Sequence, residues 1–119
     1  MSFVLPLMAM VMTSIAQPIQ VDLHLDTPSQ LLNRGLGMDV EAGLEAGLMQ
    51  LQSGGTNVAM MVLWPPRKAD HLKRTFALLE VMEREIDRLD SLVLVRNPVQ
   101  AREVAASGRL GIMLSLEGA

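Results

Sequence analysis

The stretch Val21-Asp22-Leu23-His24-Leu25-Asp26 decides how the beginning of this chain folds, because polar and apolar residues alternate along it. Successive side chains of a β-strand point to opposite faces, so the pattern predicts a strand with Asp22, His24 and Asp26 on one face. A second stretch, Leu114-Ser115-Leu116-Glu117-Gly118, predicts another strand that ends on a carboxylate. Burying ionisable groups without partners costs free energy, so we expect these polar groups to share a site with something that satisfies them.

Short apolar runs alternate with helical patterns along the rest of the chain, without an internal repeat. The predicted strands cover about residues 19–25, 56–63, 92–95 and 110–116. The predicted helices run from the cap Asp39 to Gly54, over 72–89 and over 99–106, and a loop is predicted after Thr27-Pro28. Strands joined by such helices indicate right-handed crossovers and a parallel sheet. A complete barrel takes about 250 residues, so these 119 residues predict an α/β fold: parallel strands with helical crossovers, the incomplete N-terminal part of a (β/α)8 TIM-type barrel.

The helix over 72–89 shows the clearest amphipathic pattern of the chain. Apolar residues recur in it at intervals of three and four, which predicts the packed stripe. That stripe consists of Leu72, Phe76, Leu79, Met82, Ile86 and Leu89. His71, at its start, is predicted as a surface residue, and the ten methionines of the chain are predicted as adaptable core packing.

Composition excludes several classes of protein. The net charge is −3 and Lys and Arg are not clustered, so the electrostatic footprint of a nucleic-acid binder is missing. The chain has no cysteine, so a bound metal must be held by nitrogen and oxygen donors.

The N-terminal sixteen residues resemble a signal peptide in part. Phe3 to Met12 is an uncharged apolar run, and Ser14-Ile15-Ala16 offers small residues for cleavage after Ala16. No Lys or Arg precedes the run, so a buried strand or helix of the mature fold stays an alternative. The run is too short to cross a bilayer. The chain therefore divides into residues 1–16, a signal-peptide candidate, and residues 17–119, and it is periplasmic or secreted if the signal is real and cytoplasmic otherwise.

The candidate site gathers where strands end. His24 and Asp26 close the first predicted strand and Glu117 closes the last, and functional groups in parallel α/β folds collect at the carboxyl ends of strands. Imidazole and carboxylates together suit a divalent cation, so these three are predicted metal ligands. Asp22 either orients the imidazole of His24 without binding the metal itself, or is an outward polar residue at the start of the strand. Trp64 is predicted to line a substrate pocket, although an aromatic residue at a strand end is as often a cover for the core.

Four segments of the chain resemble the membrane (renal) dipeptidases, a family of zinc-dependent barrel hydrolases. Residues 21–28 are similar to the Asp-Gly-His-Asn-Asp segment that opens the family, and Gly54-Gly55 with the following strand and Trp64 is similar to its Gly-Gly-Val strand. Residues 109–118 are similar to its Lys-Ile-to-Glu-Gly-Gly strand, and the long helix lies between them, as in the family. The resemblance covers about residues 19–119.

The resemblance implies a pair of zinc ions that hydrolyse a dipeptide through an activated water, with no catalytic residue beyond the metal ligands. His24 and Asp26 would bind the first zinc and Glu117 would bridge the two. The chain departs from the family pattern at Leu23, Leu25 and Ala119. The later histidines of the second zinc are also absent, because His71 is the only other histidine. The second site is therefore incomplete in this chain, and the fragment alone is expected to be inactive. A dipeptide is the expected partner, and a homodimer is left open.

Two other interpretations come from different classes. A haloacid-dehalogenase-type phosphohydrolase is suggested by Leu25-Asp26-Thr27, but that chemistry needs a second aspartate where His24 stands, which excludes it. A non-catalytic barrel remnant, with exposed strand edges and apolar surface, is the other interpretation and the expected behaviour of the isolated chain.

Overall fold

A computed structural model describes residues 17–66 and 70–118 of the chain. The predicted signal peptide, residues 1–16, lies outside the described residues, so the structure does not bear on it. The elements, in chain order, are β1 (Val21–Leu25), α1 (Thr27–Arg34), α2 (Leu48–Ser53), β2 (Val58–Leu63), α3 (His71–Arg88), β3 (Leu92–Leu94), α4 (Pro98–Ser107) and β4 (Leu110–Leu116). Within the described ranges, no helix has the length and apolar character needed to cross a bilayer.

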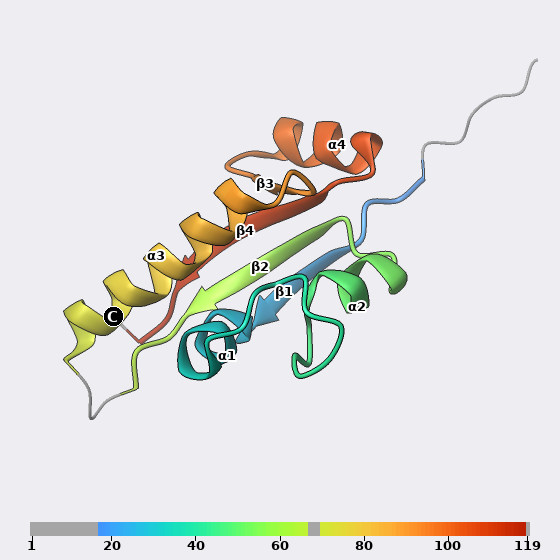
Figure 1. The fold of residues 1–119 in the computed structure, drawn as a ribbon. Coiled ribbons are helices and arrows are strands. Elements are labelled where there is room, and N and C mark those ends of the chain that lie inside the picture. Colours follow the sequence, from blue (N-terminus) through green and yellow to red (C-terminus); the bar gives the residue numbers. More distant parts are fainter. Residues whose placement is uncertain (1–16, 67–69, 119) are drawn as a thin grey trace, which may run out of the picture.

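The four strands form one parallel sheet in the order β1-β2-β4-β3 (Figure 1). β2 lies between β1 and β4, and its residues pair with β4 along its whole length, from Val58 opposite Gly111 to Leu63 opposite Leu116. β3 pairs only with the first part of β4, from Leu110 to Ile112. The predicted α/β fold of parallel strands with helical crossovers is confirmed. Because β1 and β4 flank the same strand, their carboxyl ends lie at one edge of the sheet.

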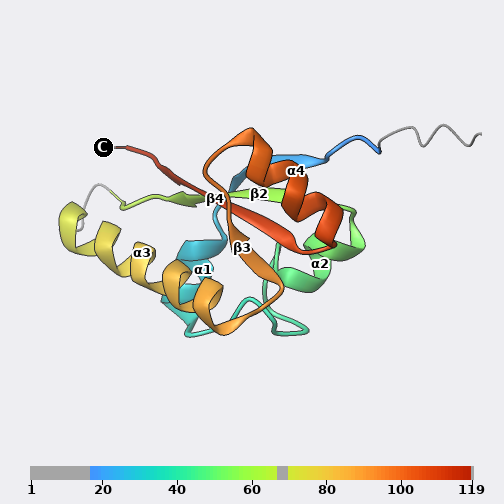
Figure 2. The same cartoon turned by 90° about the horizontal axis from the view of Figure 1, so that it is seen from above.

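The core lies between the sheet and the helices α1 and α3, which sit on one side of it (Figure 2). Alternate residues of β2 and β4 point into this core, as expected for strands with one face against helices. The innermost side chains include Ala59, Met61, Leu63, Leu110, Ile112, Leu31, Leu78 and Met82. The prediction that methionines pack the core is confirmed for Met38, Met61 and Met82, which are fully buried, and is wrong for Met49, which is 51% exposed on α2.

The segment between β1 and β2 differs from its prediction. The predicted loop after Thr27-Pro28 is the helix α1, because proline fits the first turn of a helix and Leu31 reaches the core. The helix predicted from Asp39 to Gly54 is reduced to α2. Gly43 adopts φ +102°, outside the helical range, so the first half of that segment is irregular.

α3 has the predicted position but a different packed face. Its buried residues are Leu78, Val81, Met82 and Glu85, whereas Leu72 and Phe76 are 68% and 61% exposed. The predicted stripe is therefore wrong for the first two turns of the helix, which extend past the core. Of the predicted set, only Met82 is fully buried.

A charged network ties α3 to the loop after α1. Glu85, which is almost fully buried, accepts hydrogen bonds from the Met38 backbone N–H at 2.8 Å and from Arg88 Nη2 at 2.6 Å. Arg88 also donates to both carboxylate oxygens of Asp39, at 2.6 and 3.1 Å. The hydrogen bond from Arg88 lowers the pKa of Asp39 below its ordinary value, and its two carboxylate partners raise the pKa of Arg88. The buried carboxylate is thus fully partnered, as a buried charge must be.

Candidate metal centre at the carboxyl ends of β1 and β4

The structure brings together the three residues predicted as metal ligands. His24 Nε2 lies 3.6 Å from Glu117 Oε2 and 3.7 Å from Asp26 Oδ1. His24 is near the end of β1, Asp26 follows that strand directly, and Glu117 directly follows β4. The topology explains the meeting, because β1 and β4 are both neighbours of β2 and run in the same direction.

The pairing of β1 with β2 is interrupted beside His24. Asp22 pairs with Ala59, whereas Leu25 pairs with Met61, so three steps along β1 match two steps along β2. This one-residue shift is a bulge-like irregularity that breaks the alternation of side chains. The prediction that Asp22, His24 and Asp26 share a face rests on unbroken alternation, and this shift interrupts the alternation between Asp22 and Leu25.

Asp22 nevertheless contacts His24. Its Oδ1 accepts a hydrogen bond from the backbone N–H of His24 at 3.1 Å. The contact fixes the main chain at the irregularity. The contact is with the backbone of His24, so the two interpretations of Asp22, as support for His24 or as a polar residue at a strand start, both stay predictions.

The donor atoms of His24, Asp26 and Glu117 are of the types that zinc prefers, and two of the distances between them suit zinc ligands. They do not form a complete metal site. Two ligand atoms at about 2.1 Å from a tetrahedral zinc stand roughly 3.4 Å apart, close to both distances measured from His24. In the part of the chain that the structure describes, however, no three His, Asp or Glu side chains are arranged to hold a metal ion. The side chains of His24, Asp26 and Glu117 are also 57%, 58% and 52% exposed. The described residues therefore form an open, partial donor set.

Trp64 lies at the same edge of the sheet as the carboxylates. It follows β2 directly, it is partly exposed, and its indole is next to Gly118, where an added Cβ would stand 3.6 Å from the ring. Gly118 has φ +74°, a conformation that favours glycine, so the chain can turn beside the indole immediately after Glu117. The role of Trp64 in a substrate pocket stays a prediction.

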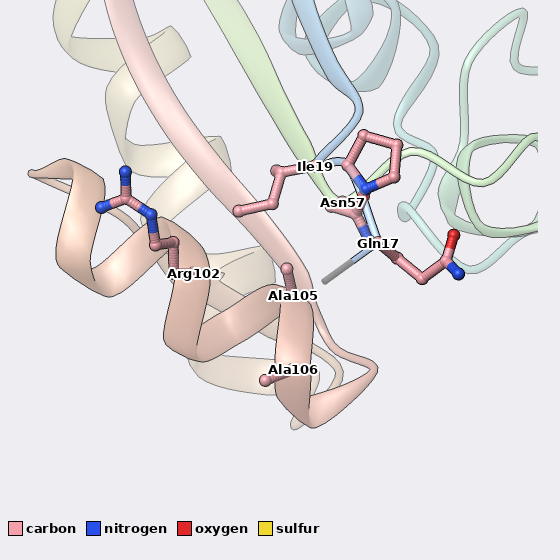
Figure 3. Close-up of a pocket in the computed structure, with 7 residues that line it drawn as sticks. Gln17, Ile19, Asn57, Arg102, Ala105 and Ala106 are labelled. Atoms are coloured by element: carbon pink, nitrogen blue, oxygen red, sulfur yellow. The ribbon is translucent and has the colours of Figure 1, made fainter. Parts of the chain in front are cut away.

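A pocket of about 630 Å³ lies at the other end of the strands (Figure 3). It sits between the segment that leads into β1 and the helix α4, far along the strands from His24 and Glu117. Its lining consists of Gln17, Pro18, Ile19, Asn57, Arg102, Ala105 and Ala106. Arg102 is the one ionisable residue among these described lining residues, which offer no acid–base pair and no metal donor set.

Comparisons with known proteins support the fold. No protein-family model and no curated protein matches the sequence. The structure is similar to the crystal structure of the dipeptidase AC, described as a metallopeptidase of family M19, with a TM-score of 0.70 and 18% sequence identity. The match covers 84% of this chain but only 35% of that chain. At this identity the similarity shows a common fold, a parallel α/β sheet consistent with part of a barrel.

Proposed function

We propose that this chain forms the N-terminal part of a zinc-dependent dipeptidase, with His24 and Asp26 as ligands of one zinc and Glu117 as the carboxylate that bridges to a second. The observation that carries this proposal is the 3.6 Å approach of His24 Nε2 to Glu117 Oε2, between residues 93 positions apart in the sequence. The similarity to a dipeptidase fold supports the same assignment.

The chain's own residues can do part of the work of such a site. Neutral imidazole and carboxylates are the donors that zinc prefers when cysteine is absent. Their exposure leaves room for water and for a peptide, and Trp64 offers an apolar ring beside Gly118 for a substrate side chain. Asp22 accepts a hydrogen bond from the backbone N–H of His24 and so holds the main chain beside the imidazole.

A bound zinc would supply a water of lowered pKa and polarise the scissile carbonyl. The chain contains only two histidines, His24 and His71, so further ligands would have to come from additional strands. Dipeptide hydrolysis is accordingly assigned to a protein in which those strands are present, and this chain alone is expected to be inactive.

A non-catalytic barrel remnant is the second candidate. The exposure of Leu72 and Phe76 on α3, and of Leu23 on β1, favours it, because soluble monomers rarely leave such apolar residues grouped at the surface. This candidate predicts no specific metal binding.

The location of the protein follows from the same proposal. A dipeptidase with a cleaved signal peptide acts in the periplasm or outside the cell, and without cleavage it stays in the cytoplasm. N-terminal sequencing of the protein from its source cells decides between these, because cleavage after Ala16 would leave Gln17 as the first residue.

Calorimetric titration of the chain with zinc at pH 7 tests the metal site. We expect weak 1:1 binding that His24→Ala and Glu117→Gln each reduce at least ten-fold, whereas the matched controls His71→Ala and Glu103→Gln leave it unchanged. Equal affinity in His24→Ala and the unaltered chain would contradict the assignment and favour the remnant.

A further inference from the structure

The carboxylate of Asp26 does not cap the helix that follows it. Asp26 is the residue before α1, yet its side chain accepts no hydrogen bond from the first turn of that helix. The residues in the same position before α3 and α4 do accept one. Asp70 accepts from the Lys73 N–H at 3.1 Å, and Asn97 accepts from the Gln100 N–H at 2.9 Å. Because aspartate is among the residues most favoured as a cap, something in the first turn of α1 must keep its carboxylate away.

Pro28 removes one donor that would hold this carboxylate. A capping side chain accepts from the N–H of the second or the third helical residue, and in α1 these residues are Pro28 and Ser29. Proline has no N–H, and the Ser29 N–H donates to the backbone oxygen of Asp26 at 3.1 Å. The two usual donors are therefore absent or occupied, which leaves the carboxylate oxygens available to another partner.

Thr27 anchors the main chain directly after Asp26. It is only 1% exposed, and a buried hydroxyl needs a hydrogen-bond partner. Thr27 Oγ1 donates to the backbone oxygen of Ala46 at 2.9 Å. In the same turn of α1, Gln30 forms two hydrogen bonds of 3.2 Å with Glu45, one to its side chain and one from its backbone. The segment before α2 thus holds the first turn of α1 in place.

The backbone conformation of Asp26 agrees with this anchoring. Its ψ is 16°, whereas the capping residues Asp70 and Asn97 are extended, with ψ of 98° and 164°. A capping side chain requires the extended conformation. Since ψ of Asp26 sets the direction of the peptide group that leads into Thr27, an anchored Thr27 maintains the value that prevents capping. The carboxylate lies instead with Oδ1 3.7 Å from His24 Nε2.

We propose that Thr27 and Pro28 are positioning residues for the Asp26 carboxylate. Pro28 frees the carboxylate from the helix N-terminus, and Thr27 holds it beside His24, where it can bind a divalent cation. The role toward zinc rests on the function proposed above, in which Asp26 is a ligand. The freed carboxylate, in contrast, is a property of the metal-free chain, so the two can be tested separately.

Amide hydrogen exchange of the metal-free chain tests the role of Pro28. Pro28→Ala supplies the missing N–H, and we expect the Asp26 carboxylate to turn and accept it. The new amide at position 28 should then exchange at least ten-fold more slowly than in a double variant that also carries Asp26→Ala. Equal exchange of this amide in the two variants would overturn the proposal.

Calorimetric titration with zinc tests the consequence for the metal site. Thr27→Val keeps the shape of the side chain but loses the hydrogen bond to Ala46, and we expect it and Pro28→Ala each to bind zinc at least five-fold more weakly. Thr27→Ser keeps the hydroxyl and should bind within about two-fold of the unaltered chain. The matched control is Thr75→Val, because the Thr75 hydroxyl also donates to a backbone oxygen, that of His71 at 2.8 Å in α3. It should leave the zinc affinity unchanged.

The two experiments distinguish failure of the positioning role from failure of the metal site. Urea denaturation of each variant without zinc gives its folded fraction, and zinc affinities are compared per folded chain. Unchanged affinity in both Thr27→Val and Pro28→Ala would overturn the proposal, and so would equal weakening by Thr27→Val and Thr27→Ser. An unaltered chain that binds no zinc, but shows the exchange difference at position 28, would overturn the metal site and leave the role of Pro28 standing.

Discussion

The helix-covered face of the sheet and the carboxyl-end edge are made by the same strands, but the side chains of the first are buried and those of the second are exposed. On the covered face, Met61 and Ile112 are fully buried in a cluster of apolar side chains, and the buried carboxylate of Glu85 is partnered by Met38 and Arg88. At the edge, His24, Asp26 and Glu117 are more than half exposed and approach one another without closing a metal site. The first region holds the core that stabilises the fold, and the second holds the residues that we propose bind a metal. Substitutions in the two regions should therefore separate stability from ligand binding.

The largest effect on stability is expected for Leu78→Ala in the covered face. Leu78 is fully buried in α3, and removing such a side chain costs about 2–5 kcal/mol through lost burial and the cavity left behind. Phe76→Ala, two residues away but largely exposed, should change the free energy of unfolding by less than about 0.5 kcal/mol. Urea denaturation of both variants measures the contrast, and equal losses would show that α3 packs by the stripe predicted from sequence.

A smaller loss is expected for Glu85→Gln. The amide keeps an acceptor for the Met38 N–H but loses the charge that pairs with Arg88, so we expect a loss of about 1–3 kcal/mol. Asp39→Asn removes the exposed end of the same network and should cost at most about 1 kcal/mol. Thermal unfolding of the two variants ranks their losses of stability. A larger loss for Asp39→Asn would show that the exposed Asp39–Arg88 pair contributes more to stability than the buried Glu85.

The pH dependence of stability tests the Asp39–Arg88 pair. The pKa of Asp39 is lowered in the folded chain, so the unfolded state binds the proton more readily. The contribution of Asp39 is therefore fully present above its ordinary pKa of 3.8 and is lost as the pH falls through the lowered folded value. The stability difference between the unaltered chain and Asp39→Asn should be constant from pH 7 to about 5 and shrink in more acidic solution. A difference independent of pH down to 2 would contradict this.

The smallest effect on stability is expected at the edge. His24→Ala and Glu117→Gln change exposed side chains and should leave the unfolding free energy of the metal-free chain within about 0.5 kcal/mol. Any rise in melting temperature that zinc produces in the unaltered chain should disappear in both variants, since only a folded-state ligand stabilises the fold. A large loss of stability without metal would indicate that these residues serve the fold instead of a ligand.

Much of the fold could be predicted because apolar runs indicate buried strands and cap residues indicate where helices begin. The strand over 58–63 is a continuous apolar run, and the caps Asp70 and Asn97 mark where α3 and α4 begin. The helix α1 was missed because its eight residues TPSQLLNR contain few apolar positions, and its stability comes from Leu31 reaching the core. Such tertiary effects override local propensity.

The convergence of the site residues could also be predicted, because carboxyl ends of neighbouring parallel strands meet at one edge. The register shift between Asp22 and Leu25 could not. It depends on how β1 fits β2, which the alternation of polar and apolar residues does not reveal. The packed face of α3 was predicted incorrectly for a related reason: Glu85 is buried through its bonds to Met38 and Arg88, and a hydropathy pattern counts a carboxylate as exposed.

The position of β2 between β1 and β4 sets a length requirement on the side chains that meet at the edge. Neighbouring strands lie about 4.8 Å apart, so the backbones that carry His24 and Glu117 are separated by two such intervals, and β2 acts as a spacer of fixed width. Side chains from both outer strands cross this interval, because His24 Nε2 approaches Glu117 Oε2 to 3.6 Å. The central strand thus sets the distance over which the two side chains meet.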